Sequence, residues 1–135
     1  MRLSGALWAA AMVAAVTTSA AAETYPSRPV TLVVAYAAGG TGDIVARVIS
    51  ERLGRALGQA IVVENRAGAS GAIGTRTVVA AVPDGHTLLV GQTGEIAITP
   101  HWSKGAGYDP DRDLQPVALA TVVPLALVAP GKASY

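Results

Sequence analysis

The chain is 135 residues long, has a formal net charge of +1 and contains no cysteine. That length suits one small domain, and the balanced charge offers no basic patch for nucleic acid or anionic lipid. Without cysteine the chain has no disulfide, thiol nucleophile, thiolate metal site or cysteine-linked lipid anchor. A folded form must therefore depend on its apolar core.

Residues 1–22 have the pattern of a secretory signal peptide. Arg2 precedes an apolar run from Leu3 to Val16, and small residues follow as far as Ala22. This apolar run is shorter than the roughly 20 residues that a membrane-spanning helix needs. We expect cleavage after about Ala22, which leaves an exported chain without formal net charge.

Residues 30–57 predict a strand, a glycine-rich turn and a helix. Apolar and β-branched residues fill positions 30–35, as is typical of a strand buried on both faces of a parallel sheet. Apolar residues then recur with helical period over 44–57, and Gly58 marks the helix end. The turn at 36–43 has three glycines where the first N–H groups of the helix lack partners, a geometry that binds anions.

The same order of elements then repeats. We expect strands at 60–64 and 87–90, a helix at about 73–81, glycine-containing turns at 65–74 and 91–95, and a short helix that ends before Pro100. Strands that alternate with helices indicate βαβ units in a parallel sheet, whose ligands bind outside the carboxyl ends of the strands. All three glycine-containing turns follow a strand, so all three should meet at one sheet edge.

Two more apolar runs, residues 117–123 and 125–128, flank Pro124. The first run is a candidate for a further strand of the sheet, and the second has the character of a crossover that leaves the domain. The sequence thus predicts one α/β lobe over residues 23–123 and a crossover over residues 124–135.

Nucleotide binding is one alternative use of the sheet edge. Gly40-Thr41-Gly42 follows a strand, and Glu64 lies about twenty residues on, where a ribose-binding carboxylate would stand. However, Val45 occupies the position of the third small residue, and Asp43 places a negative charge where a pyrophosphate would lie. No P-loop sequence is present either. These features count against a nucleotide.

Hydrolysis is a second alternative, centred on Ser70. A nucleophile elbow needs glycine two residues to either side, but Ser70 has Gly68 before it and Ala72 after it. His86 and His101 show no sequence relation to Ser70 and no metal-ligand spacing. We therefore expect no catalytic residue, no metal and no cofactor.

Charged residues of the turns have two interpretations each. Asp43 either complements the helix dipole and caps free N–H groups, which we favour, or faces a cationic group of a ligand. Glu95 opposes the capture of an anion unless it points away or meets a cationic ligand group. Arg47, Arg52 and Arg55 are expected to form the solvated face of the first helix.

Six motifs occur in the order and spacing of a known family. They are Tyr25-Pro-Ser-Arg-Pro29, the segments 35–43, 62–68, 71–74 and 83–89, and the segment 108–110 together with 114–117. Over essentially all of the mature sequence, the chain resembles the periplasmic receptors of tripartite tricarboxylate transporters, also called the Bug family.

The resemblance implies a lobe of a type II periplasmic-binding-protein fold, with a mainly parallel sheet flanked by helices. It implies a periplasmic receptor without enzyme activity, which holds a small carboxylate or acidic amino acid between two lobes and delivers it to the membrane components of the transporter. Carried over from the family, the ligand-binding positions are Tyr36, Ala38, Gly39, Gly40, Thr41, Gly42, Asp43, Ser70, Gly71, Gln92, Thr93 and Gly94.

Three features depart from the family pattern. Ala38 stands where proline is common, and Gln92 to Glu95 replace small hydroxylated residues that often surround the glycine of the third loop. Members are also well over twice this length, so we expect the second lobe to be missing and the chain to be a truncated form. An exported hydrolase-like or nucleotide-dependent enzyme fragment, or a non-functional remnant, are the alternatives.

Overall fold

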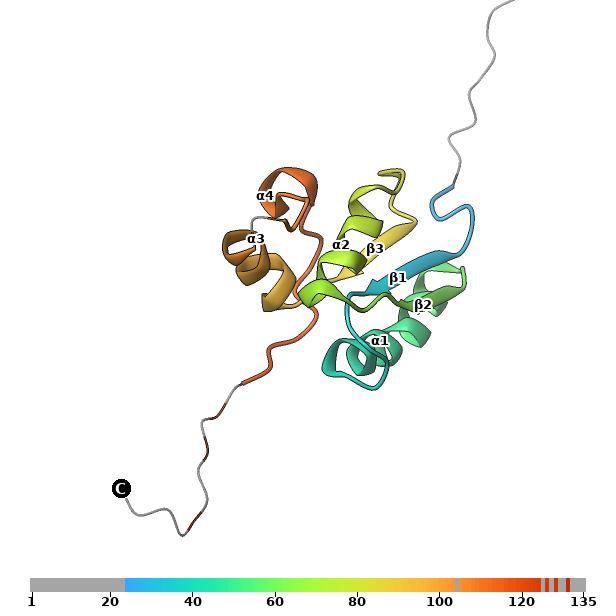
Figure 1. The fold of residues 1–135 in the computed structure, drawn as a ribbon. Helices are drawn as coiled ribbons and strands as arrows, with labels where there is room; N and C mark the ends of the chain where they lie inside the picture. Colours follow the sequence, from blue (N-terminus) through green and yellow to red (C-terminus); the bar gives the residue numbers. More distant parts are fainter. Residues whose placement is uncertain (1–23, 104, 125, 127, 129–130, 132–135) are drawn as a thin grey trace, which may run out of the picture.

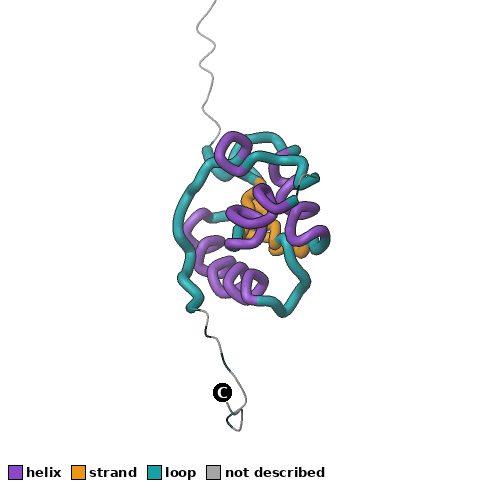
Figure 2. The backbone as a smooth tube through the Cα atoms, turned by 60° about the vertical axis from the view of Figure 1, so that its left-hand side comes forward, coloured by secondary structure: helices purple, strands orange, loops and turns teal. Residues whose placement is uncertain are grey.

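The computed structural model describes residues 24–103, 105–124, 126, 128 and 131. A three-stranded parallel sheet lies among the helices, and the short helices α3 and α4 lie beyond one end of the strands (Figure 1). Figure 2 shows helical segments around the strands. Within the described residues, no helix is both long enough and apolar enough to cross a membrane. The expected signal peptide falls outside this part of the chain.

Strand β1 (Val30–Val34) is the centre of the sheet, with β2 (Ile61–Asn65) on one side and β3 (Thr87–Val90) on the other. In the parallel register, Val34 lies opposite Asn65 in β2 and Val90 in β3. The three strands therefore end at the same level. The loops that follow them begin side by side, which confirms the predicted convergence at one sheet edge.

Helix α1 (Thr41–Leu57) packs on one face of the sheet. Leu32 and Val34 of β1 form a buried cluster with Ala46 of the helix. The helix begins three residues earlier than the sequence predicts, because the extended Gly40 serves as N-cap and the last part of the expected turn is the first helical turn. Gly58, in the left-handed conformation with φ 68°, ends the helix as predicted.

Helix α2 (Ala72–Val79) covers the opposite face, after the single 3₁₀ turn η1 (Ala69–Gly71). A β-carbon on Gly74 would lie 2.7 Å from Ala35 Cα and 2.8 Å from the carbonyl oxygen of Arg66. Since side chains alternate along a strand, Ala35 is on the face opposite Leu32 and Val34. Only glycine permits this approach of the helix to the sheet.

The chain after β3 forms the π-helical turn η2 (Gly94–Ile98), helix α3 (Thr99–Trp102) and helix α4 (Pro110–Asp113). The prediction that the helical segment ends before Pro100 was wrong. Pro100 occupies the first turn of α3, where a backbone N–H has no helical partner to lose. Asp109 accepts a hydrogen bond from the N–H of Asp111 and so caps α4.

The prediction of a further strand at residues 117–123 was also wrong. The segment has no regular secondary structure, and Val117, Leu119 and Val122 are each more than three-quarters exposed. An apolar run becomes a strand only when it pairs and packs, and the described residues give it no paired neighbour beside β2 or β3. Most of the expected crossover, residues 124–135, lies outside the described residues.

Candidate functional site

The first loop, residues 36–40, leads from β1 into the N-terminus of α1. Ala38 and Gly39 are exposed, and Gly39 has φ 83°. In the described structure, the backbone N–H groups of Thr41, Gly42 and Asp43 have no acceptor, and no side chain caps this helix end. Free N–H groups at the positive end of a helix dipole favour a bound anion.

Asp43 is turned back into this loop. The residue is only 4% exposed, and its carboxylate accepts hydrogen bonds from the N–H of Gly39 at 2.8 Å and from Arg47 Nε at 3.0 Å. The hydrogen bond from Arg47, and then that from Gly39, lowers the pKa of Asp43 to about 2. Arg47 itself is on the solvated side of α1 and compensates this negative charge. Asp43 lies in the first turn, where its charge complements the helix dipole, but it bonds to the loop and to Arg47. The expectation that it caps free N–H groups of the helix was therefore wrong.

The second loop carries strained backbone. Ala69 and Ser70 have φ values of 48° and 51°, and the buried Gly71 has φ 89°. The carbonyl oxygen of Ser70 accepts a hydrogen bond from Thr99 Oγ1 at 3.0 Å, which joins this loop to α3. Left-handed conformations of non-glycine residues persist where the surroundings hold them, and this bond is one such constraint.

The third loop lies against the first turn of α1. A β-carbon on Gly42 would lie 2.8 Å from Gln92 Nε2, so the side chain of Gln92 fills the space that glycine leaves. Thr93 is exposed, and Gly94 opens the turn η2. A side chain on Gly94 would overlap the hydroxyl of Tyr36, which brings the first and third loops into direct contact.

Glu95 is where all three loops meet. It is fully buried, with Oε2 accepting a hydrogen bond from the hydroxyl of Tyr36 at 2.8 Å and Oε1 accepting one from the N–H of Gln92 at 2.7 Å. A β-carbon on Gly71 would lie 2.8 Å from Glu95 Cβ. The hydroxyl of Tyr108 also donates to the Glu95 carbonyl oxygen at 2.6 Å. Glu95 thus points inward and joins the loops.

The pKa of Tyr36 is raised by its burial and by its contact with Glu95. Its hydroxyl is directed into the protein, where burial and then the hydrogen bond to Glu95 raise its pKa to about 12. Its backbone carbonyl accepts a hydrogen bond from Asn65 Nδ2 at 3.2 Å, which fixes the start of the first loop to the end of β2. Tyr36 therefore orders the site whether or not it also touches a ligand.

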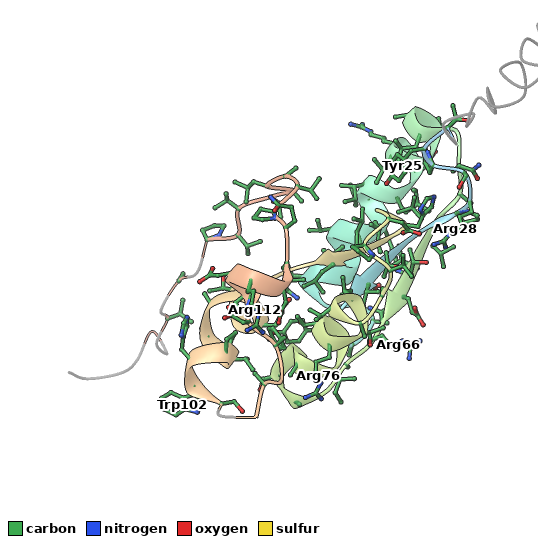
Figure 3. All side chains as sticks on the ribbon, turned by 90° about the horizontal axis from the view of Figure 1, so that it is seen from above. Tyr25, Arg28, Arg66, Arg76, Trp102 and Arg112 are labelled. Carbon is green, nitrogen blue, oxygen red and sulfur yellow. The ribbon has the colours of Figure 1, made fainter. Side chains whose placement is uncertain are left out.

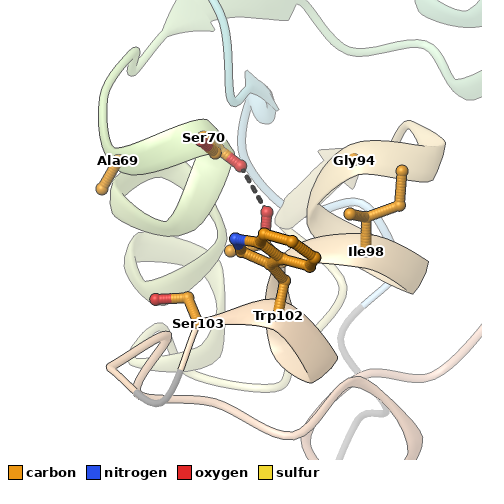
Figure 4. A pocket seen from close by; sticks show the side chains of 7 residues that line it. Ala69, Ser70, Gly94, Ile98, Trp102 and Ser103 are labelled. Carbon is orange, nitrogen blue, oxygen red and sulfur yellow. Dashed lines mark hydrogen bonds between the residues drawn. The ribbon is translucent and has the colours of Figure 1, made fainter.

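A surface hollow of about 380 Å³ opens between the second and third loops (Figure 4). Uncharged residues alone line it: Ala69, Ser70, Gly94, Ile98, Thr99, Trp102 and Ser103. Among them only Ser70 and Gly94 belong to the predicted site. The indole of Trp102 is 88% exposed and lies between the two loops in the view of Figure 4. Figure 3 places Trp102 at the opposite end of the molecule from Tyr25 and Arg28.

The sequence analysis did not predict that Glu95 connects the three loops. It also did not predict that Thr99 and Trp102 line the surface hollow. The sequence did contain a signal for Glu95. Gly71 and Gly94 fall in loops expected at one sheet edge, and residues without a side chain there leave room for a neighbouring side chain. For Thr99 and Trp102 the signal was hidden by the assumption that the helix ends before Pro100.

The histidines lie apart from Ser70. His86 is buried just before β3, at the amino end of the sheet, with its ring centroid 5.1 Å from that of Tyr25. Ser70 is at the carboxyl edge, and His101 is exposed on α3. Neither histidine forms a hydrogen bond with Ser70. The described residues therefore contain no Ser–His pair for hydrolysis.

Comparison with known proteins decides between receptor and enzyme. A family model described as the tripartite tricarboxylate transporter family receptor matches residues 45–135. The chain belongs to this family. The family consists of receptors, which sets the two enzyme alternatives aside.

Curated relatives agree with this assignment. A UPF0065 protein of Bordetella bronchiseptica is 45% identical over 116 residues, which are 86% of this chain and 35% of that protein. Protein BugT of Bordetella pertussis is 41% identical over 108 residues, which are 79% of this chain and 33% of BugT. The chain therefore spans about a third of the length of the curated relatives that it matches.

Solved structures confirm the predicted α/β fold of a periplasmic binding protein. MatC from Rhodopseudomonas palustris with bound malate is 44% identical, with a TM-score of 0.68 over 71% of this chain and 33% of MatC. A second R. palustris protein, solved with adipate, is 41% identical with a TM-score of 0.62 over 64% of this chain and 29% of its own. Periplasmic binding protein BugD is 43% identical with a TM-score of 0.58, over 64% and 28% of the two chains.

Proposed function

We propose that this chain forms the first lobe of a periplasmic receptor, which captures a small carboxylate and delivers it to the membrane components of a tripartite transporter. The observation that carries the proposal is the uncapped N-terminus of α1. Its three free N–H groups, at Thr41, Gly42 and Asp43, lie at the sheet edge where all three loops converge.

Capture would depend on backbone rather than on cationic side chains. A carboxylate at the α1 N-terminus would accept hydrogen bonds from the free N–H groups, while Gly39 and Gly40 leave room for its approach. Asp43 would hold the loop and Arg47 would offset its charge. The ligand would also meet the second and third loops beside the helix N-terminus, at Ser70, Gly71, Gln92, Thr93 and Gly94. Matched relatives of about two and a half times this length support a second lobe as the opposite wall.

Ligands of the relatives give the class of compound to try first. Malate and adipate are bound in two of the similar structures, and both are small organic acids. The signal-peptide pattern of residues 1–22 and the periplasmic description of BugD support a periplasmic location. Closure of the two lobes around the ligand would report occupancy to the membrane partner.

The decisive variant is Thr41→Pro in the complete mature protein. Thr41 is the first helical residue, where proline is well tolerated, and Gly40 before it is extended with ψ 170°, as a residue before proline should be. The substitution therefore removes one N–H donor and retains the helix. Because a hydrogen bond to a charged group contributes about 1.5–3 kcal/mol, we expect carboxylate affinity to fall roughly 10- to 100-fold by calorimetry.

Thr41→Ala is the matched control, since it removes the same side chain and retains the N–H. It should bind carboxylates within about threefold of the unmodified protein, because the side chain is exposed. Equal affinity in the proline variant, with an unchanged melting temperature, would show that the α1 N-terminus does not hold the ligand.

A further inference from the structure

We infer that Glu95 sets the charge selectivity of the site, against dianionic acids and in favour of acids with one negative charge or with an added ammonium group. The inference rests on the proposed carboxylate site. The inferred selectivity differs from what two similar structures hold, since malate and adipate both have two carboxyl groups.

Hydrogen bonds at both side-chain oxygens hold Glu95 inside the protein. Oε2 bonds to the hydroxyl of Tyr36 and Oε1 accepts from the N–H of Gln92. An ionised carboxylate can accept both bonds, and the selectivity that we infer requires this form. Side-chain exposure is 0%. Among the residues that the structure describes, no arginine, lysine or histidine forms an ion pair with it.

Asp43 and Glu64, the other acidic side chains near the loops, are each paired with an arginine. Asp43 pairs with Arg47, and Arg66 pairs with Glu64. Arg76 directs its guanidinium at the carbonyl oxygen of Ala106, 3.1 Å away. Among the described residues, Glu95 is therefore a buried acidic side chain without an ion-pair partner, and it lies where the three loops meet.

Glu95 also lies close to the proposed ligand positions. Tyr36 and Gln92 bond to the Glu95 carboxylate directly, and a β-carbon on Gly71 would lie 3.3 Å from Oε2. A ligand that contacts any of these three residues is separated from the Glu95 carboxylate by that residue alone. At about 8 Å and an effective dielectric constant of about 20, each negative charge of a ligand loses roughly tenfold or more in affinity.

Selectivity follows because the helix N-terminus and Glu95 act on different parts of a ligand. One carboxylate is stabilised by the free N–H groups of α1, whereas a second carboxylate that lies near the meeting point of the loops is repelled by Glu95. An ammonium group in the second position is attracted instead.

Glu95→Gln isolates the charge. The amide oxygen can accept from the N–H of Gln92, and the amide nitrogen can donate to the hydroxyl of Tyr36, so both hydrogen bonds persist without the charge. Glu51→Gln is the matched control. It removes the same charge from the exposed face of α1, where Glu51 is 79% exposed and paired with Arg55.

The test is calorimetric titration of the complete mature protein and both variants with two matched probe series. The aliphatic series is succinate, butyrate and 4-aminobutyrate, and the aromatic series is terephthalate, benzoate and 4-(aminomethyl)benzoate. In Glu95→Gln we expect the affinity ratio of dianion to monoanion to rise about tenfold and the advantage of the amino acid to shrink. Glu51→Gln should leave both ratios unchanged.

Tyr36→Phe distinguishes charge from loop order. It breaks the hydrogen bond to Glu95 and keeps the charge, so all probes should weaken together without a change in the ratios. If the protein binds these acids but Glu95→Gln leaves the ratios unchanged, the inference is overturned and the proposed function stands. If no form binds any carboxylate, the proposed function is overturned, and the inference with it.

Discussion

Thr99 Oγ1 donates a hydrogen bond to the carbonyl oxygen of Ser70 at 3.0 Å, across 29 residues of sequence. Ser70 is in the left-handed conformation with φ 51°, and Thr99 is 6% exposed. A buried side chain of α3 thus holds a strained residue of the second loop in place. Both residues line the surface hollow, where Figure 4 labels Ser70.

Thr99→Val should loosen this connection. Valine has nearly the same shape but no donor, so the carbonyl of Ser70 loses its partner and the unfolding free energy should fall by about 1–2 kcal/mol. Denaturant unfolding measures the loss. Thr77→Val is the control, because Thr77 Oγ1 bonds only to the Ile73 carbonyl within its own helix, and this change should be near neutral. Equal losses in both variants would contradict a special role for Thr99.

Gly74→Ala should disturb the contact of α2 with the sheet. The new methyl group would lie 2.7 Å from Ala35 Cα and 2.8 Å from the Arg66 carbonyl oxygen, both backbone atoms that cannot move aside cheaply. We expect a loss of about 1–3 kcal/mol in unfolding free energy. At Gly105 a β-carbon meets nothing within 4 Å, so Gly105→Ala should be tolerated. A stable Gly74→Ala variant would show that α2 can shift away from β1.

Sequence patterns predicted the helices and strands that are determined by residues close together in the chain. The apolar run of β1, the helical period of α1 and the glycine at its end all appear where expected, because burial and φ freedom act within a few residues. The convergence of three loops at one edge followed from the parallel order of strands. These inferences needed no knowledge of side-chain contacts.

Contacts between distant segments were the part that sequence could not supply. Glu95 is buried because Tyr36 and Tyr108 reach it from 59 and 13 residues away, and no local pattern shows this. The prediction of a strand at residues 117–123 was wrong for a related reason. Their apolar run has the composition of a strand, but a strand also requires a neighbour to pair with, and the described chain offers none there.

The Asp43 carboxylate should contribute to stability in a pH-dependent way. Its pKa is about 2 in the folded protein, below the ordinary 3.8, chiefly because of the hydrogen bond from Arg47. The unfolded state therefore takes up the proton first as pH falls. The stabilisation is fully present above about pH 4 and is lost as pH falls towards 2.

Asp43→Asn should remove that acid dependence and lower stability at neutral pH. The free energy of unfolding of the variant and of the unmodified protein, measured between about pH 2 and 5, tests this prediction. Asp84, whose pKa is also about 2 because of the N–H of His86 and the guanidinium of Arg28, lies at the other sheet edge. Asp84→Asn is therefore the control, and of the two variants only Asp43→Asn should also weaken carboxylate binding. Parallel pH profiles for Asp43→Asn and the unmodified protein would contradict the role assigned to Asp43.

Tyr36 should make the protein sensitive to alkali. Burial, and then its hydrogen bond to Glu95, raises its pKa to about 12 from the ordinary 10.0. Unfolded chains lose this proton first as pH rises, so the stabilisation is complete below about pH 10 and disappears as pH rises through about 12. Ultraviolet titration of tyrosinate should show a late-ionising group that is absent in Tyr36→Phe.

Glu95→Gln gives the sharper form of this experiment. With the negative charge removed, the pKa of Tyr36 should move from about 12 towards its ordinary value, while burial holds it above 10. If Tyr36 ionises at the same pH with and without the Glu95 charge, Glu95 is not ionised in the folded protein. It could then not repel a second carboxylate of a ligand.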